Sequence, residues 1–237
     1  TALYGTGGGV TIDSDPAGEY LESRWKIAIL THTADFSLLE TMRSGADGKI
    51  YLLERHLDRL ASSAKYFDIS LDLESVRDPL ATVGGPARVR LTVDRFGGVH
   101  VETSRLPTTL ARPRVVLDDV PVDPSDPFLH HKTTNRAIYE RAMARHPDAD
   151  DVILINDDDL ATETTMANLV VQLDGVWCTP PLDDGCLAGI ERGLLLEEGK
   201  VEERSVRIRD LDQATGLARV NSLRGWEDVE FLSSPIS

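Results

Sequence analysis

The chain has 237 residues, 41% of them hydrophobic and 27% charged, and a formal net charge of −15. These proportions are typical of a globular protein, and the length allows one large domain or two smaller ones. The acidic balance argues against non-specific nucleic-acid binding, which needs a basic face, and against binding to anionic membrane surfaces. We therefore expect neither nucleic acid nor membrane as a partner.

Cysteine content and hydropathy indicate the compartment. The two cysteines, Cys178 and Cys186, are too few for a disulfide framework, and we expect both to pack as small apolar residues. No apolar run is long enough to span a bilayer, and the N-terminus lacks the basic and apolar regions of a signal peptide. These features predict a cytoplasmic protein.

The first thirty residues differ from the rest of the chain. A glycine-rich run at residues 5–9 is followed by the turn-forming sequence DSDP at residues 13–16. Residues 19–30 then show helical spacing of apolar groups. The glycine run is not a dinucleotide-binding fingerprint, because no strand precedes it. The segment is too short to form a domain.

Residues 36–106 predict a small α+β lobe. Leu57, Leu60, Ala61 and Ala64 share one face of an amphipathic helix, and Gly97 with Gly98 marks a hairpin turn. The expected elements are strands at 36–43 and 49–52, helices at 54–67 and 72–82, and paired strands at 87–94 and 99–106.

The remaining residues predict a second α+β lobe, with the division between the lobes within residues 106–121. The elements expected there are strands at 114–120, 152–156, 169–173, 176–179, 201–208, 217–221 and 229–232, helices at 134–145 and 189–198, and a proline-rich connection at 121–127.

Two residues about thirty positions apart indicate chemistry. Lys132 precedes a predicted helix, and a lysine at such a junction can bind a carbonyl cofactor as a Schiff base. Glu163 lies next to a predicted strand, where a carboxylate can hold a pyridinium proton. Taken alone, Lys132 could equally be a solvated surface lysine and Glu163 a cap residue among local hydrogen-bonding side chains. Together they suggest an enzyme that uses pyridoxal phosphate (PLP).

The cofactor phosphate would need anion donors, and the chain offers two candidates. The glycine-containing segment at residues 185–190 opens a predicted helix, whose first N–H groups can bind an anion. Arg59 could supply a guanidinium fork. The alternatives are an ordinary helix start and a surface arginine paired with Glu54 or Asp58. Arg43, Arg90 and Arg224, in or beside predicted strands, are candidates for binding a substrate carboxylate, unless they face solvent.

At this point several motifs together resemble the class IV aminotransferases, which are PLP enzymes of fold type IV. The resemblance covers residues 35–232 in family order, and its combined specificity is high. The motifs that carry it are LETMR (39–43), LERHLDRLASSA (53–64), HKTTNR (131–136), ETTMANL (163–169), TPPL (179–182) and GCLAGIER (185–192).

The resemblance implies a two-lobed α+β fold with the PLP cleft between the lobes, and a role for each matched residue. Lys132 is implied as the Schiff-base lysine and Glu163 as the partner of the ring nitrogen. The other implied cofactor-binding residues are Arg59, Asn168, Gly189, Ile190, Glu191 and Ser222, with Ile190 and Glu191 acting through their backbone N–H groups. The family often has a small hydroxyl residue at the position of Glu191, so only the backbone donor remains there.

Within the class, LLETMR (38–43) and NSLRGW (221–226) resemble the aminodeoxychorismate lyase domains fused to para-aminobenzoate synthase component I. Residues 1–30 resemble the C-terminal end of a chorismate-utilising synthase domain. We interpret them as a remnant in which Glu19 and Glu22 are orphaned, and we expect no metal site. The expected boundaries are 1–30 for the remnant, 31–112 for the small lobe and 113–237 for the larger lobe with the lysine.

The implied activity is the PLP-dependent cleavage of 4-amino-4-deoxychorismate to para-aminobenzoate and pyruvate, in folate biosynthesis. Stand-alone lyases tend to carry threonine where Glu40 stands, whereas glutamate is common in class IV transaminases and fused lyases. Glu40 thus joins Arg43, Arg90 and Arg224 as an expected substrate-binding residue. Two alternatives remain: a branched-chain or D-amino acid transaminase, and a non-catalytic relic of the fusion. The resemblance further implies a homodimer and a small-molecule amine as substrate, and it leaves open whether a separate synthase partner is needed.

Overall fold

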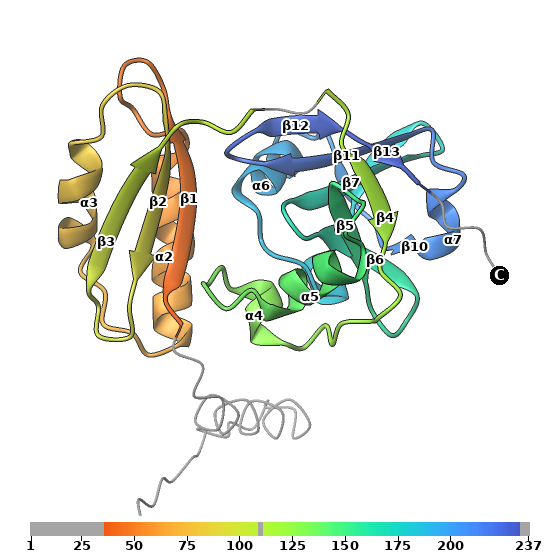
Figure 1. Cartoon of the computed structure of the whole chain (residues 1–237), viewed down its shortest axis with the longest axis horizontal. Coiled ribbons are helices and arrows are strands. Elements are labelled where there is room, and N and C mark those ends of the chain that lie inside the picture. The colour runs from red at the N-terminus through yellow and green to blue at the C-terminus, as the bar shows by residue number, and fades with distance from the viewer. Residues whose placement is uncertain (1–35, 109–110, 233–237) are drawn as a thin grey trace, which may run out of the picture. The chain divides into compact units, whose positions relative to one another are not determined.

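The computed structural model describes residues 36–108 and 111–232, so the expectations for residues 1–30 lie outside the described residues. Two sheets organise this part of the chain, one of three strands and one of ten (Figure 1). They correspond to the two α+β lobes expected from the sequence. In the described part, no helix combines the length and the apolar character needed to cross a membrane.

The small lobe pairs its strands in the antiparallel order β1-β2-β3. Its elements are β1 (Leu38–Ser44), α2 (Leu53–Tyr66), α3 (Leu73–Ala81), β2 (Ala87–Val93) and β3 (Val99–Ser104).

Strict alternation divides the two faces of this sheet. Val89 and Leu91 of β2 are fully buried and pack with Leu57 and Val76 of the two helices. The intervening residues Arg88, Arg90 and Thr92 point to the opposite face, because successive side chains of a strand alternate. One face of the small sheet therefore builds the core, and the other is polar.

The larger lobe is built around the ten-stranded sheet, whose main path runs β12-β11-β7-β6-β5-β4-β13. Its elements are β4 (Arg114–Leu117), α4 (Pro127–His130), α5 (Ala137–Arg145), β5 (Asp151–Ile155), β6 (Leu160–Thr164), β7 (Asn168–Leu173), β8 (Val176–Thr179), the 3₁₀ helix η1 (Leu182–Asp184), α6 (Ile190–Glu197), β9 (Glu202–Glu203), β10 (Val206–Arg207), α7 (Ile208–Leu211), β11 (Gly216–Asn221), β12 (Gly225–Asp228) and β13 (Glu230–Phe231).

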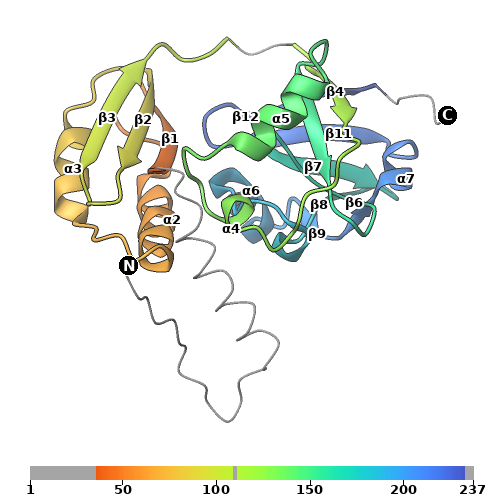
Figure 2. The same ribbon diagram turned by 60° about the horizontal axis from the view of Figure 1, so that its bottom comes forward.

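Both faces of the central strands are apolar, so they carry continuous runs of buried residues. Leu169 and Val171 of β7 join one apolar cluster, whereas Val170 between them packs with Leu195 of α6. In β5, Val152 and Leu154 pack beneath α5 (Figure 2). Helices α5 and α6 therefore pack against one face of the larger sheet, and the largest apolar cluster of this lobe lies on the opposite face.

Three sequence-based assignments are wrong. Residues 49–52 form no strand: only Ile50 bridges Ser44, and Leu52 then takes a positive φ of 52° before α2. The helix expected from residue 134 begins at Ala137, because the preceding segment is held extended by an antiparallel bridge from Thr133 to Leu38. The strand expected at 201–208 is divided into β9, β10 and the short helix α7.

A few specific contacts join the lobes beside Lys132. The Leu39 N–H donates to the Lys132 carbonyl at 2.9 Å, and the Ser37 N–H donates to the Thr134 hydroxyl at 2.9 Å. Farther along α2, Arg59 Nη1 donates to the carbonyl of Ala188, just before α6, at 3.0 Å. The start of β1 therefore fixes the backbone on both sides of the lysine.

Candidate functional site

A cavity of about 390 Å³ lies between the polar face of the small sheet and the larger lobe. All but three of the site residues expected from the sequence line it. Those that do are Arg59, Arg90, Lys132, Glu163, Asn168, Gly189, Ile190, Ser222 and Arg224; those that do not are Glu40, Arg43 and Glu191.

Lys132 lies between α4 and α5, with its amine directed to the cavity. Within the described residues, its amine forms no hydrogen bond and no ion pair. Burial, reinforced by the charge of Arg59, lowers the pKa of Lys132 to about 8. An amine with such a pKa is partly neutral near physiological pH, and it can therefore act as nucleophile and as base.

Glu163 lies at the end of β6, where a tight turn brings Asn168 of β7 directly beside it. The Tyr139 hydroxyl donates to Glu163 Oε1 at 2.8 Å, and Asn168 Nδ2 donates to Oε2 at 3.2 Å. Burial raises the pKa of Glu163 to about 7. A protonated ring nitrogen placed against this carboxyl would favour the ionised form, because an opposite charge nearby lowers the pKa of an acid.

Tyr139 is a site residue that the sequence reasoning missed. It projects from α5 to Glu163 and is buried, and burial raises the pKa of its hydroxyl well above the usual value. A signal was present in the sequence, because a buried tyrosine hydroxyl needs a hydrogen-bond partner. Tyr139 falls on the apolar face of the predicted helix, which places that hydroxyl toward the strands beneath.

The start of α6 offers anion donors to the cavity. Gly189 precedes the helix, no side chain caps it, and the first N–H groups of a helix lack intrahelical partners. A Cβ at Gly189 would lie 1.8 Å from Asn168 Oδ1, so only glycine fits there. Ser222, from the β11–β12 turn, lines the same cavity, and its hydroxyl has no hydrogen-bond partner in the described part of the chain.

Arg59 is oriented by a buried carboxylate. Glu40 lies on the core face of β1 and accepts from Arg59 Nε at 2.8 Å and Nη2 at 2.6 Å. His56 Nδ1 lies 2.7 Å from the same carboxylate, and among the residues that the structure describes His56 Nε2 is buried without a hydrogen-bond partner. Although burial by itself raises the pKa of Glu40, the charge of Arg59 and the hydrogen bonds to both partners lower it to about 2.

These contacts differ from those expected of a substrate-binding residue, because Glu40 points away from the cavity. Arg43 likewise lies outside the lining and stacks over the Tyr51 ring, with its guanidinium carbon 4.2 Å from the ring centroid. The Glu191 side chain is also outside, and in the described part of the chain its Oε2 is buried without a hydrogen-bond partner. Burial raises the pKa of Glu191. At this position only the backbone N–H is left to face a ligand.

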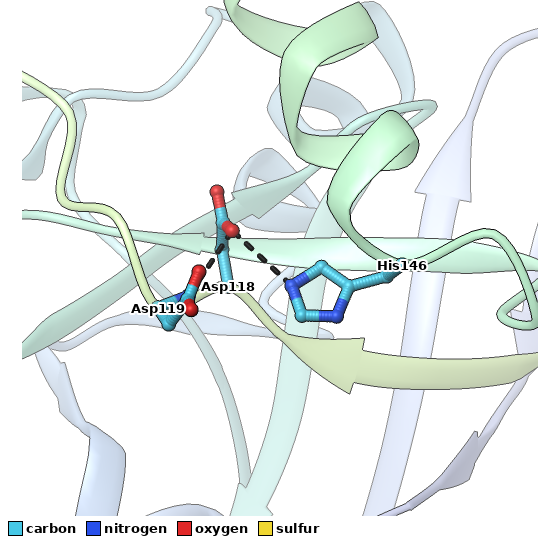
Figure 3. Close-up of side chains that lie close together, drawn as sticks. All are labelled: Asp118, Asp119 and His146. Atoms are coloured by element: carbon cyan, nitrogen blue, oxygen red, sulfur yellow. Dashed lines mark hydrogen bonds and ion pairs between the residues drawn. The ribbon is translucent and has the colours of Figure 1, made fainter.

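Away from the cavity, Asp118, Asp119 and His146 bring three side chains of metal-ligand type together (Figure 3). Arg145 donates to both carboxylate oxygens of Asp118, and His146 Nε2 lies 3.3 Å from one of them. A guanidinium therefore already lies where a cation would bind. We interpret the cluster as an ion-pair network that joins the end of β4 to the end of α5.

Comparisons with known proteins agree with this architecture. The family model described as amino-transferase class IV matches residues 37–230. A Schizosaccharomyces pombe protein, provisionally named aminodeoxychorismate lyase, is 33% identical over 199 residues, which cover 79% of this chain and 82% of that protein.

Two crystal structures show the same fold. A Mesorhizobium loti protein, provisionally described as an amino-acid aminotransferase, has a TM-score of 0.77 and 32% identity, covering 84% of this chain and all of the other. The 4-amino-4-deoxychorismate lyase of Pseudomonas aeruginosa has a TM-score of 0.70 and 25% identity, covering 83% of each chain. The two-lobed fold expected from the sequence is confirmed.

Proposed function

We propose that this chain, which belongs to the class IV aminotransferase family, is a 4-amino-4-deoxychorismate lyase that releases para-aminobenzoate and pyruvate. Enzymes of this family depend on PLP, which when bound supplies an electron sink for the carbon that bears the substrate amine. The observation that carries the proposal is the sharing of one cavity by Lys132, with a lowered pKa, and Glu163, with a raised pKa.

The residues of the cavity fit this cofactor. The phosphate would be held by Arg59, the Ser222 hydroxyl and the first N–H groups of α6, which begins directly after Gly189. The ring nitrogen would face Glu163, whose orientation Tyr139 and Asn168 secure. Lys132 would supply the covalent link, since its amine has no competing partner in the described residues.

Lys132 would act as the general base of the reaction. With its neutral Nζ free in the cavity, Lys132 would remove the proton from the carbon that bears the substrate amine. It returns this proton to the departing enolpyruvyl group, which leaves as pyruvate while the ring becomes aromatic. Glu163 stays ionised throughout and opposes the positive charge on the ring nitrogen. Arg90 and Arg224, both in the cavity wall, are the candidates for holding substrate carboxylates.

The test measures pyruvate release from 4-amino-4-deoxychorismate in the absence of any keto-acid acceptor, and a coupled lactate dehydrogenase assay detects the pyruvate. We expect wild-type protein to release pyruvate and Lys132→Ala to lose about 10³-fold or more of the rate. Lys49→Ala, which changes an exposed lysine, is the matched control. Borohydride reduction with mass mapping should locate the cofactor on Lys132. Undiminished turnover by Lys132→Ala would refute the role assigned to this lysine.

A transaminase of the same fold is the second candidate, because Glu40 is the residue common in class IV transaminases and the Mesorhizobium loti protein is 32% identical. It would use the same Lys132 and Glu163 on a branched-chain or D-amino acid. Turnover that requires a keto-acid acceptor would favour it. Failure of the protein to bind PLP would instead favour a non-catalytic relic. A homodimer and a synthase partner remain predictions from the family.

A further inference from the structure

The cavity is strongly cationic although the chain is acidic. The protein carries a net charge of −15, yet the cavity wall gathers Lys132 and six arginines. Among the described lining residues, Glu163 supplies the only carboxylate. Lys132, Glu163 and Arg59 are assigned to the cofactor, and Arg136 donates to the carbonyl of Thr165. The remaining arginines, Arg88, Arg90, Arg105 and Arg224, form a surplus of positive charge that the cofactor does not use.

Arg88 stands out because its strand neighbours cannot neutralise it. The register of the small sheet places it between Arg43 of β1 and Ser104 of β3, so neither cross-strand neighbour is an acid. Arg90, by contrast, lies opposite Glu102, whose carboxylate lies 3.1 Å from His100. Within the described part of the chain, Arg88 has no hydrogen bond and no ion pair. A half-buried guanidinium in a cavity wall without a counter-ion is suited to an anionic ligand.

Arg224 faces this position from the other lobe. It lies in the turn between β11 and β12, and its nearest carboxylate, Glu227, is 3.9 Å away and also binds Arg219 at 3.0 Å. Burial lowers the pKa of Arg224, and the positive charge of Arg88 contributes in the same direction. Both guanidinium groups line the same cavity, one from each lobe, and like charges that face one cavity repel each other. An anion between them would remove this repulsion.

The distance of this position from Lys132 follows from the strand register. The Leu39 N–H donates to the Lys132 carbonyl, and Leu39, Thr41 and Arg43 pair in turn with Thr92, Arg90 and Arg88. Arg90 is therefore two residues nearer than Arg88 to the lysine end of the sheet. Two residues of a strand span about 7 Å. The Cα atoms of Arg90 and Arg88 therefore lie about 7 Å apart along the cavity wall, with Arg90 on the side of the lysine.

We propose that Arg88 and Arg224 form an outer carboxylate subsite, which makes the enzyme selective for amines that carry two carboxylates. The inference rests on the proposed lyase function, in that it names how the substrate is recognised. One carboxylate binds at Arg90, and the second binds between Arg88 of the small lobe and Arg224 of the larger lobe. A branched-chain amino acid, with one carboxylate, would leave the outer pair unoccupied.

The test compares two unreactive acids, isophthalate and benzoate, which differ by one carboxylate on the same ring. Their affinities for the PLP-loaded protein are measured by isothermal titration calorimetry. We expect isophthalate to bind at least about tenfold more tightly, because charge-assisted hydrogen bonds contribute at this level. Arg88→Gln and Arg224→Gln should each abolish the preference, and Arg88→Gln should leave benzoate binding unchanged. Arg95→Gln, which removes an exposed arginine beside Phe96 in the same lobe, is the matched control.

The possible outcomes distinguish a failure of the proposed subsite from a failure of the proposed lyase activity. Equal affinity of the wild-type protein for the two acids would overturn the proposal, as would a preference that persists in Arg88→Gln or is equally lost in Arg95→Gln. The PLP absorption band of each variant verifies that the cofactor site is intact. Because neither acid reacts, a protein that released no pyruvate could still show the preference. In that case the lyase assignment would fail while the dicarboxylate subsite remained.

Discussion

At the residue scale, the lowered pKa of Lys132 predicts how the protein captures its cofactor. Only the neutral amine reacts with the PLP aldehyde, and burial sets its pKa to about 8. The capture rate of cofactor-free protein should therefore rise about tenfold per pH unit below 8 and level off above it. Stopped-flow absorbance measures this profile, with Nα-acetyl-lysine as the reference amine. If the capture rate of the protein levelled off only at the same high pH as that of the reference amine, burial would not lower the pKa of Lys132.

Substitution of Glu40 is expected to affect cofactor binding indirectly, because Glu40 contacts Arg59 and does not line the cavity. Removing its charge in Glu40→Gln should loosen the guanidinium and leave the buried His56 without an ionised partner. We expect PLP affinity to fall by roughly tenfold, in line with the loss of a charge-assisted hydrogen bond. Titration of the cofactor-free protein with PLP gives the affinity.

Glu54→Gln, which changes an exposed carboxylate of α2 that pairs with Arg77 of α3, is the control for this measurement.

The sign of the pH effect of Glu40 on stability follows from its lowered pKa. Since the folded pKa of Glu40 is about 2, below its ordinary value of 4.5, the carboxylate stabilises the fold above pH 4.5, and this contribution is lost as the pH falls toward 2. A variant with reduced thermal stability but unchanged PLP affinity would give Glu40 a structural role only.

At the scale of elements, the sequence predicted best those segments whose side chains face a core. The alternation of β2 and the apolar face of α2 identify these elements, because burial imposes their period. The strand β6 was missed for the opposite reason. Its residues Thr162, Glu163 and Thr164 are polar and yet buried, since they serve the site and their neighbours. A strand that carries functional side chains does not show the apolar pattern by which strands are recognised.

The same distinction applies within the site. Lys132, Glu163, Arg59 and Gly189, which line the cavity, were predicted as site residues because they stand in motifs that can be matched along the chain. Arg88 could not be found in that way, because its significance depends on the register of three strands and on a turn from the other lobe. Glu40 stands in a matched motif, but its partners on α2 became evident only once β1 was placed against that helix.

At the scale of the whole molecule, the proposed cofactor contacts come from both lobes, which are also joined by the ion pair of Arg55 with Glu197 and by the contact of Ser63 with His131. Arg59 belongs to α2 of the small lobe, whereas Lys132 and the start of α6 belong to the larger one. Through its phosphate, the cofactor would connect α2 to α6. A ligand that binds only the folded state stabilises it, and the stabilised region is the one whose opening would break the contacts.

Hydrogen exchange followed by mass spectrometry tests this arrangement, with pyridoxal, which lacks the phosphate, as the matched ligand. PLP should slow exchange in α2 and at the start of α6 as well as around Lys132. Pyridoxal, at concentrations that give equal occupancy, should slow it around Lys132 and β6 but leave α2 nearly unchanged. The difference arises because Arg59 and the first N–H groups of α6 have an anion to bind only in the first case. Equal protection of α2 by both ligands would place the phosphate elsewhere and remove Arg59 from the cofactor site.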